Sequence, residues 1–143
     1  MTIAMLIADR PGEVWHCHAD DRVADAVEIL ATRRIGALPV SDAGNDVAGI
    51  FSERDVLYAL KTHGAAALDM RVREVMTAPV ISVAPSQTAL EALGLMTRRR
   101  IRHLPVVDKD RMVGFVSIGD LVKYRIDRIE AEADALRVYI QSA

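Results

Sequence analysis

The sequence repeats itself once, and this repeat constrains the fold more than any other feature. Arg33–Asp42 reads RRIGALPVSD, and Arg99–Asp108 reads RRIRHLPVVD, with seven of ten residues identical at an offset of 66. Gly49–Asp55 and Gly114–Asp120 match at an offset of 65. The offset changes by one residue in a polar stretch, where a turn tolerates a deletion. Two units of about 60 residues are too few and too long for an open solenoid. We therefore expect two similar halves packed about a pseudo-twofold axis, with a cleft between them in two copies.

Composition indicates a soluble globular protein. The 143 residues suffice for one compact domain, and 51% hydrophobic with 27% charged residues is far from the composition of disordered chains. The net charge of -2 gives no overall field that would recruit nucleic acid or an anionic membrane. The single cysteine, Cys17, excludes an internal disulfide and fits a reducing compartment.

The N-terminal apolar run also bears on location. Residues 1–8 are too short for the core of a signal peptide and are followed by Asp9 and Arg10. No run of 18 apolar residues occurs that could span a membrane. We expect a cytoplasmic protein without a membrane partner.

Each unit shows the same order of elements. A helix is predicted from Val23 by apolar residues at i, i+3, i+4 and i+7, with Asp20 or Asp21 as its cap. Its counterpart runs from about 86 to 98, with Ser86 or a Thr88–Glu91 capping box at its start. We expect the apolar residues of this second helix to face inward: Leu90, Leu93 and Met96.

The predicted strands follow and precede these helices. Runs 35–41 and 101–107 are β-rich, but each contains a proline, which favours an edge position or a strand start. Second strands are predicted at 47–51 and 112–116, each followed by a helix opened by a serine, and shorter extended pieces at 14–18 and 80–83 precede each unit. The fold class is therefore α/β, with two β-α-β-β-α repeats. The expected divisions are 1–66, 67–125 and a helical extension over 126–143.

The last helix is longer than its counterpart. Its apolar positions are spaced 4, 3, 4, 3 and 4 residues apart, which is an a/d pattern over nearly three heptads. From 121 to 140 it would be roughly 30 Å long. The pattern leaves two alternatives open: packing on this chain's own core, or a dimer contact. The positions are Val122, Ile126, Ile129, Ala133, Leu136 and Ile140.

These doubled motifs resemble the cystathionine-beta-synthase (CBS) domain, a family found as tandem pairs that are also called Bateman modules. The resemblance rests on the doubled Leu-Pro-Val strand, the doubled Gly-hydrophobic-x-Ser-x-x-Asp, and Met76-Thr77 before residues 79–83. It covers roughly residues 5 to 125. It implies a ligand-sensing module that holds an adenosine-containing molecule between its repeats, such as AMP, ADP, ATP, NAD(H) or S-adenosylmethionine.

The doubled Ser-x-x-Asp motif suits such a ligand chemically. A serine that opens a helix leaves backbone amides free to attract phosphate, and a carboxylate can accept both ribose hydroxyls. The resemblance gives the ribose role to Asp55 and Asp120 and the phosphate role to Ser52 and Ser117. The alternative is that these residues only cap their helices.

The resemblance also indicates where adenine and further phosphate contacts would lie. Adenine would lie against the extended segments before each first helix, which are Val14-Trp15-His16 and Val80-Ile81-Ser82. Trp15 either stacks on the base or belongs to the core. Arg100, Arg102 and His103 would supply positive charge, although strand alternation lets only one of the last two face the cleft. The first repeat has Gly36-Ala37 there, with Arg54 as a possible substitute, so we expect unequal affinities and the better site where Arg102 and His103 contribute.

Metal binding and catalysis are not expected. On a strand, His16 and His18 would face one way and Cys17 the other, so the three could not chelate one ion. The sequence contains no nucleophile–base constellation and no phosphate-cradling glycine loop.

The sequence thus predicts a stand-alone regulatory module, not an enzyme, that binds an adenosine-containing ligand and signals through a conformational or oligomeric change. A homodimer and an unidentified regulated protein are the expected partners. The alternatives are a scaffold dimer without a nucleotide, and a nucleic-acid binder with a basic face. That face would consist of Arg33, Arg34, Arg98, Arg99, Arg100 and Arg102.

Overall fold

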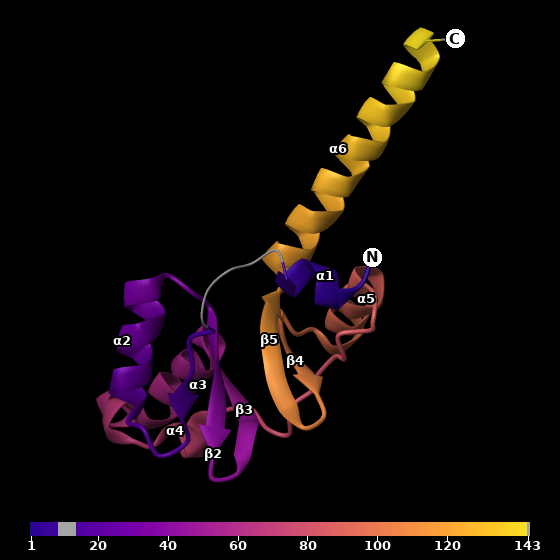
Figure 1. Ribbon diagram of the computed structural model, residues 1–143. Coiled ribbons are helices and arrows are strands. Elements are labelled where there is room, and N and C mark those ends of the chain that lie inside the picture. Colours follow the sequence, from indigo (N-terminus) through magenta and orange to yellow (C-terminus); the bar gives the residue numbers. More distant parts are fainter. Residues whose placement is uncertain (9–13, 143) are drawn as a thin grey trace.

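The computed structural model describes residues 1–8 and 14–142 (Figure 1). Asp9 and Arg10, and the last residue of the expected extension, Ala143, lie outside this range. The helices and strands of the described residues follow the predicted order, with additional short helices. In chain order they are α1 (Ile3–Ala8), β1 (Cys17–His18), α2 (Val23–Arg33), β2 (Ala37–Asp42), β3 (Asn45–Ser52), α3 (Glu53–His63), the 3₁₀ helix η1 (Gly64–Asp69), α4 (Val72–Val75), α5 (Ala89–Arg99), β4 (His103–Asp108), β5 (Arg111–Ser117) and α6 (Ile118–Ser142).

The strands form two small sheets, one for each repeat. In the first sheet β2 lies between β1, which is parallel to it, and β3, which is antiparallel. The expectation of an edge position for the proline strand is therefore wrong for β2. Proline is tolerated there because β1 pairs with β2 only from Val40 onward, after Pro39. In the second sheet β4 pairs with β5, and the predicted leading strand is reduced to one bridge between Val83 and Val106.

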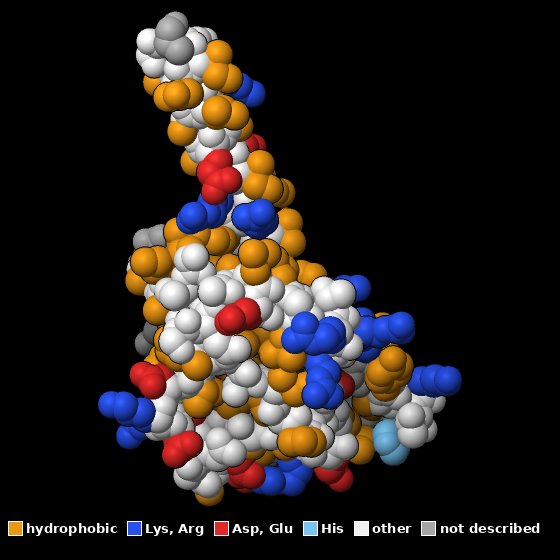
Figure 2. All heavy atoms as spheres, turned by 90° about the vertical axis from the view of Figure 1, so that its right-hand side faces the viewer, with side chains coloured by type: hydrophobic (Ala, Val, Ile, Leu, Met, Phe, Trp, Pro, Cys, Tyr) orange, Lys and Arg blue, Asp and Glu red, His pale blue; other side chains and the backbone are white. Residues whose placement is uncertain are grey.

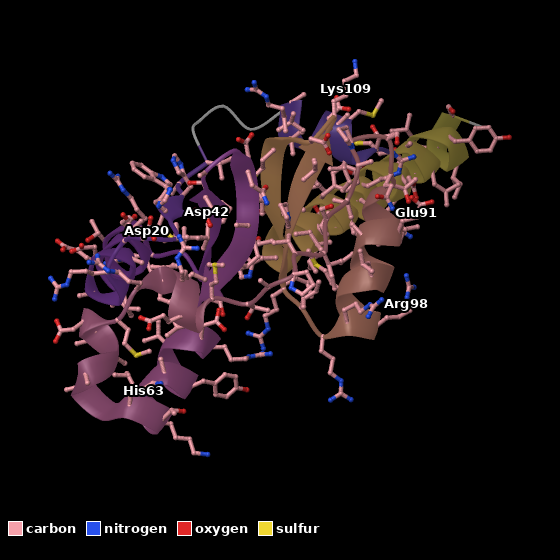
Figure 3. The ribbon with its side chains drawn as sticks, turned by 90° about the horizontal axis from the view of Figure 1, so that it is seen from below. Asp20, Asp42, His63, Glu91, Arg98 and Lys109 are labelled. Carbon is pink, nitrogen blue, oxygen red and sulfur yellow. The ribbon has the colours of Figure 1, made fainter. Side chains whose placement is uncertain are left out.

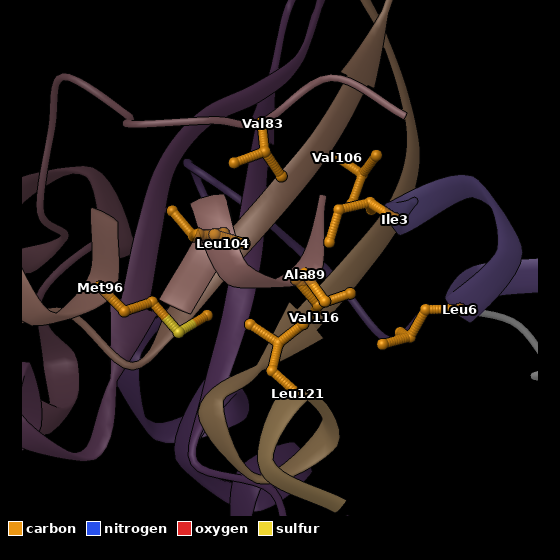
Figure 4. Close-up of a cluster of buried hydrophobic side chains, with 10 residues drawn as sticks. Ile3, Leu6, Val83, Ala89, Met96, Leu104, Val106, Val116 and Leu121 are labelled. Carbon is orange, nitrogen blue, oxygen red and sulfur yellow. The ribbon is translucent and has the colours of Figure 1, made fainter. Parts of the chain in front are cut away.

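Each repeat's hydrophobic core is completed by the short helix that precedes the other repeat in the chain. The second core contains Ile3 and Leu6 of α1 together with Leu104, Val116 and other residues of the second repeat (Figure 4). The first core contains Val72 of α4. Since α1 precedes the first repeat and α4 precedes the second, the two repeats have exchanged their leading helices. A cut near residue 66 would separate both cores from part of their packing.

Polar contacts fix α4 on the first repeat in the same way. The Arg73 guanidinium donates to Asp20 at 2.7 Å and to Asp42 at 2.9 Å, and these two carboxylates lie near one another in Figure 3. Hydrogen bonding from Arg73 holds the pKa of Asp42 below its ordinary value. The backbone N–H groups of Val72 and Arg73 also donate to the carbonyls of Asp21 and Ala19. Residues more than 50 positions apart are thus joined at the surface as well as in the core.

The helix caps confirm one prediction and correct another. Thr88 opens α5, and its capping box with Glu91 is formed, as predicted. Helix α2 instead begins after Arg22, which makes no side-chain cap. Asp21 lies one residue before this cap position and accepts from the His18 N–H in the preceding turn, so neither Asp20 nor Asp21 is the cap.

The buried face of α5 also differs from the prediction. Small residues, Ala89 and Ala92, lie in the core beside Met96, and Leu93 is partly buried against them. Leu90 is 61% exposed, so its assignment to the inward face is wrong. Small side chains let the helix lie close to its sheet, and the helix is thereby rotated away from the orientation that its leucines suggested.

The last helix, α6, extends away from the rest of the molecule (Figure 1). Only its first turns pack on the second core, through the buried Leu121 and the partly buried Tyr124. The large apolar a/d residues beyond them, Ile126, Ile129, Leu136 and Ile140, are exposed, so the seam does not pack on this chain's own core. Among the helices of the described residues, none combines the length and low charge that crossing a bilayer requires.

A cleft between the two repeats

A cleft of about 450 Å³ lies where the two repeats meet, on the side of the second repeat's long helix. Its size is in the range of ligand pockets. Its walls come from the segment before β1, the α2–β2 junction, the start of β4 and the β5–α6 junction. The lining residues are Ile7, Val14, Trp15, Arg34, Ile35, Gly36, Ala37, His103, Val113, Gly114, Phe115, Ser117 and Asp120.

At the β5–α6 junction a serine and an aspartate organise the start of the helix. The Asp120 N–H donates to the Ser117 hydroxyl at 3.1 Å, and the Ser117 N–H donates to the Asp120 carboxylate at 2.8 Å. The Ile118 N–H donates to the carbonyl of Arg102, which directly precedes β4. These bonds hold the carboxylate and the amide end of α6 at the cleft wall, where an anion is favoured.

The same arrangement occurs in the first repeat. Ser52 caps α3, Asp55 accepts from the Ser52 N–H at 2.9 Å, and the Glu53 N–H donates to the carbonyl of Gly36. Here the other Asp55 oxygen accepts from the Thr77 hydroxyl at 2.8 Å. A ribose that used both oxygens of Asp55 would have to share this oxygen with Thr77 or displace its hydroxyl.

His103 joins the two repeats inside the cleft. Its ring stacks on Phe115, with 5.7 Å between the ring centroids and 10° between the planes. A Cβ on Gly36 would lie only 3.3 Å from the ring, so the glycine makes room for the histidine. Burial lowers the pKa of His103; the nearby carboxylates of Asp120 and Glu53 oppose this shift, and Arg102 adds to it.

Two arginines occupy an uncommon backbone conformation at the ends of the repeats' first helices. Arg34 and Arg100, which are 66 positions apart, both have φ of 53°, in the left-handed region. Glycine or asparagine is the usual residue at such a helix end. Arg34 lines the cleft, so this conformation directs a cationic residue to it.

A family model for the CBS domain matches residues 10–62 and 72–127, which is most of the chain. The chain belongs to the CBS-domain family. The two matched segments are the two repeats, so it is a tandem CBS pair, as the doubled motifs predicted.

Several related proteins share this CBS pair. The mitochondrial CBS domain-containing protein CBSX3 of Arabidopsis thaliana is 39% identical over 132 residues, which cover 90% of this chain and 64% of that protein. The chain therefore spans less than two thirds of that relative. The crystal structure of the CBS-domain containing protein ATU1752 from Agrobacterium tumefaciens is 35% identical, with a TM-score of 0.82 over 87% of this chain and 92% of that one. The CBS pair of protein MJ0100, solved with 5′-methylthioadenosine and S-adenosyl-L-methionine, shares the fold at 22% identity, with a TM-score of 0.78 over 90% and 98% of the two chains.

The CBS pair gathers part of the predicted site into this one cleft. Five of the predicted residues line it, drawn from both ends of the chain: Val14, Trp15, His103, Ser117 and Asp120. His16 lines an adjoining open groove. The others line neither the cleft nor this groove: Ser52, Arg54, Asp55, Val80, Ile81, Ser82, Arg100 and Arg102. Their ligand roles stay predictions.

Trp15 is not a core residue in this CBS pair, which removes one of its two predicted alternatives. Its side chain is 43% exposed and lines both the cleft and the groove. The Arg33 guanidinium lies over the indole, 3.7 Å from the ring centroid, in a cation–π contact. Stacking of a base on Trp15 is left as a prediction.

Several cleft residues lie outside the predicted site. Arg34 does carry a signal in the sequence, because it is the repeat counterpart of Arg100, a predicted site residue. Gly36 departs from the basic pattern of the second repeat, and its lack of a side chain is what makes room for His103. Ile7 and Phe115 carry no chemical signal, and only the packing of α1 and β5 brings them to the cleft.

The His16-Cys17-His18 segment has the alternation that was predicted for a strand. Cys17 is buried, and burial raises the pKa of its thiol to about 12, while His16 is exposed. Across residues 1–8 and 14–142, no group of three histidine, cysteine or acidic side chains is arranged to hold a metal ion.

Proposed function

We propose that this CBS pair is a regulatory module that binds an adenosine-containing ligand in the cleft at Asp120. The proposal rests on one observation above all: the carboxylate of Asp120 and the amide end of α6 lie in an inter-repeat cleft that also contains Arg34 and His103. A sugar and its phosphate need these groups close together.

Each part of such a ligand would contact cleft residues of suited chemistry. The ribose hydroxyls would donate to Asp120, and the phosphate or carboxylate would lie near the amides of α6, Ser117 and Arg34. The flat aromatic face of adenine would lie against Val14 and Trp15. AMP, ADP, ATP, NAD(H) and S-adenosylmethionine all fit this description, and the ligands named for the MJ0100 pair belong to the same chemical class.

The Asp55 motif is the second, weaker site in this proposal. Its carboxylate already accepts from the Thr77 hydroxyl, which a ligand there would have to accommodate. Unequal affinity was expected from the sequence because Gly36-Ala37 stand where the second repeat has Arg102-His103. The placement of His103 in the Asp120 cleft supports the same ranking.

The module would signal without catalysis. A ligand that touches both repeats favours one relative orientation of them, and coupling of this kind is typically worth about 1–3 kcal/mol. The ligand would change the relative orientation of the repeats, or of the two chains of a homodimer. A regulated partner protein would respond to that change. The single buried thiol suits a reducing compartment such as the cytoplasm.

Thermal unfolding with each candidate ligand tests the proposal. A ligand at about 100 times its dissociation constant should add about 2.7 kcal/mol to the free energy of unfolding and raise Tm by several degrees. Asp120→Asn should remove most of that increase, because the amide offers one acceptor oxygen instead of two but still accepts the Ser117 N–H. Asp127→Asn, on the exposed side of α6, changes the charge equally and should keep the full increase. Equal increases in the two variants would refute the role of Asp120.

A scaffold dimer that binds no nucleotide is the second candidate, and the exposed apolar face of α6 favours it. It predicts no stabilisation by any of these ligands, together with a dimer that depends on α6. The nucleic-acid alternative is weakened, since Arg33 lies on Trp15 and Arg34 lines the cleft.

A further inference from the structure

The apolar stripe of α6 has no partner in this chain. Val122, Ile126, Ile129, Leu136 and Ile140 are each between 43% and 63% exposed, on a helix that extends away from both cores. Figure 2 shows the projecting helix with hydrophobic side chains along its length and charged ones beside them. Exposure of so many large apolar residues in one line marks an interaction surface.

The spacing of this stripe fits another helix. With Val122, Ile129 and Leu136 at d positions, and Ile126, Ala133 and Ile140 at a positions, the stripe is a narrow coiled-coil seam. Residues 118–142 contain four Lys or Arg and five Asp or Glu, so the helix lacks the cationic face of helices that lie on anionic membranes.

The charges beside the seam favour a second copy of the same helix. In a parallel pair in register, each g residue faces the next e residue of the partner helix. Arg125 then faces Glu130 of the second copy, and Glu132 faces Arg137 of the second copy. By the twofold symmetry this gives four attractive contacts.

The opposite orientation brings like charges together. In an antiparallel pair that matches all six apolar positions, e faces e and g faces g. Glu130 would then face Glu130 of the second copy, and Glu132 would face Glu132. Lys123 would face Arg137, so every pair of charged residues that face each other in this arrangement is repulsive.

Existing ion pairs within α6 do not prevent the parallel arrangement. Glu132 contacts Arg128 at 3.2 Å and Arg137 contacts Asp134 at 3.0 Å, but these side chains are largely exposed. Exposed pairs of this kind contribute little and exchange readily. Within the part of the chain that the structure describes, Arg125 and Glu130 form no ion pair, so they are the cleaner test.

We propose that two copies of this chain associate through α6 as a parallel, in-register coiled coil, with Arg125 of each copy paired to Glu130 of the other. The two clefts then lie at the same end of the dimer. This builds on the homodimer of the proposed function but does not depend on a nucleotide.

Cysteine crosslinking tests the orientation. Under mild oxidation, Val122→Cys and Ile140→Cys should each form a disulfide-linked dimer with itself, since equal positions meet in a parallel pair. Mixing the two variants should give no link between 122 and 140. Arg128→Cys, on the outer face, and the unmodified chain with its buried Cys17 are the controls. A 122–140 link in the mixture, without self-linked dimers, would overturn the parallel arrangement.

Charge reversal tests the pairing, with the dimer dissociation constant measured by light scattering or sedimentation. Arg125→Glu should raise this constant roughly tenfold, because two attractive pairs become repulsive. Adding Glu130→Arg in the same chain should restore it to near the original value. Absence of rescue would refute the pairing.

Two substitutions in the seam separate this proposal from the wider homodimer hypothesis. Ile129→Asp should convert the dimer to monomer, and Ala133→Ile should tighten it, since β-branched residues at a positions favour parallel dimers. A dimer that is unchanged by Ile129→Asp would overturn the coiled coil but not the homodimer. An unmodified chain that is monomeric, or that co-sediments as monomer with phosphatidylglycerol vesicles, would overturn both.

Discussion

His103 shows how one side chain can serve both repeats. It comes from β4, stacks on Phe115 of its own repeat, and fills the space left by Gly36 of the other. Its burial disfavours the charged imidazolium, while two carboxylates, Asp120 and Glu53, favour it. Burial prevails, so the ring carries a proton less readily in the folded protein than in the unfolded chain.

This lowered pKa gives a pH dependence with a definite sign. Below the ordinary value of 6.5 the unfolded chain takes up a proton that folded His103 resists, so the free energy of unfolding should fall as the pH drops below 6.5. Urea unfolding well above and well below that pH measures the loss. His103→Gln should reduce it, whereas His63→Gln, on the exposed end of α3, should not. An equal loss in all three proteins would contradict this interpretation.

Arg34 and Arg100 allow stability and binding to be separated at the residue scale. Both have a positive φ, which costs about 1–2 kcal/mol for a residue with a side chain. Arg34→Gly and Arg100→Gly should therefore each raise the free energy of unfolding, by up to about 1 kcal/mol because glycine is also more flexible when unfolded. Arg34→Gly should weaken ligand binding more than Arg100→Gly, because Arg34 lines the Asp120 cleft. Calorimetry with the ligand found by thermal unfolding can measure the difference. Equal weakening by both would indicate that Arg100 also reaches the ligand.

At the scale of elements, the capping boxes explain where the helices begin. The hydroxyl of Thr88 accepts the Glu91 N–H at 3.1 Å, and Glu91 accepts the Thr88 N–H at 2.9 Å. The sequence predicts this capping box because it joins residues three positions apart. It does not predict the start of α2, because Asp21 instead accepts a hydrogen bond from His18 of β1.

Thr88→Ala should lower the free energy of unfolding by about 1 kcal/mol, because the Glu91 amide loses its acceptor. Thr97→Ala is the matched control. Its hydroxyl donates only to the Leu93 carbonyl within the same helix, and its loss should change stability by less than about 0.5 kcal/mol. Urea unfolding of both variants is the measurement, and an equal effect would argue that the box contributes nothing.

At the scale of the whole molecule, the exchange of leading helices ties the two repeats into one folding unit. The six residues of α1 place Ile3 and Leu6 in the core of the second repeat, more than 75 positions away from its other members. The same exchange positions Ile7 at the cleft. A repeat that moves therefore also moves the short helix that packs in its core and precedes the other repeat.

Ile3→Ala should lower the free energy of unfolding by about 2–4 kcal/mol, although it lies almost at the N-terminus, because its side chain is fully buried. Met5→Ala, in the same short helix but 54% exposed, should cost less than about 0.5 kcal/mol. A single cooperative transition in both variants is expected. Loss of the second repeat alone, with the first still folded, would contradict the exchange.

The sequence by itself determined the doubled unit, the α/β class, the family, the serine-opened helices and the long last helix with its seam. These follow from patterns within a few residues, or from comparison of the chain with itself. Only the tertiary structure decided that α1 and α4 are exchanged, that Asp120 and not Asp55 lines the described cleft with His103, and that the seam is left exposed. Those outcomes depend on contacts between residues that are far apart in the chain, and neither hydrophobic period nor motif spacing records such contacts.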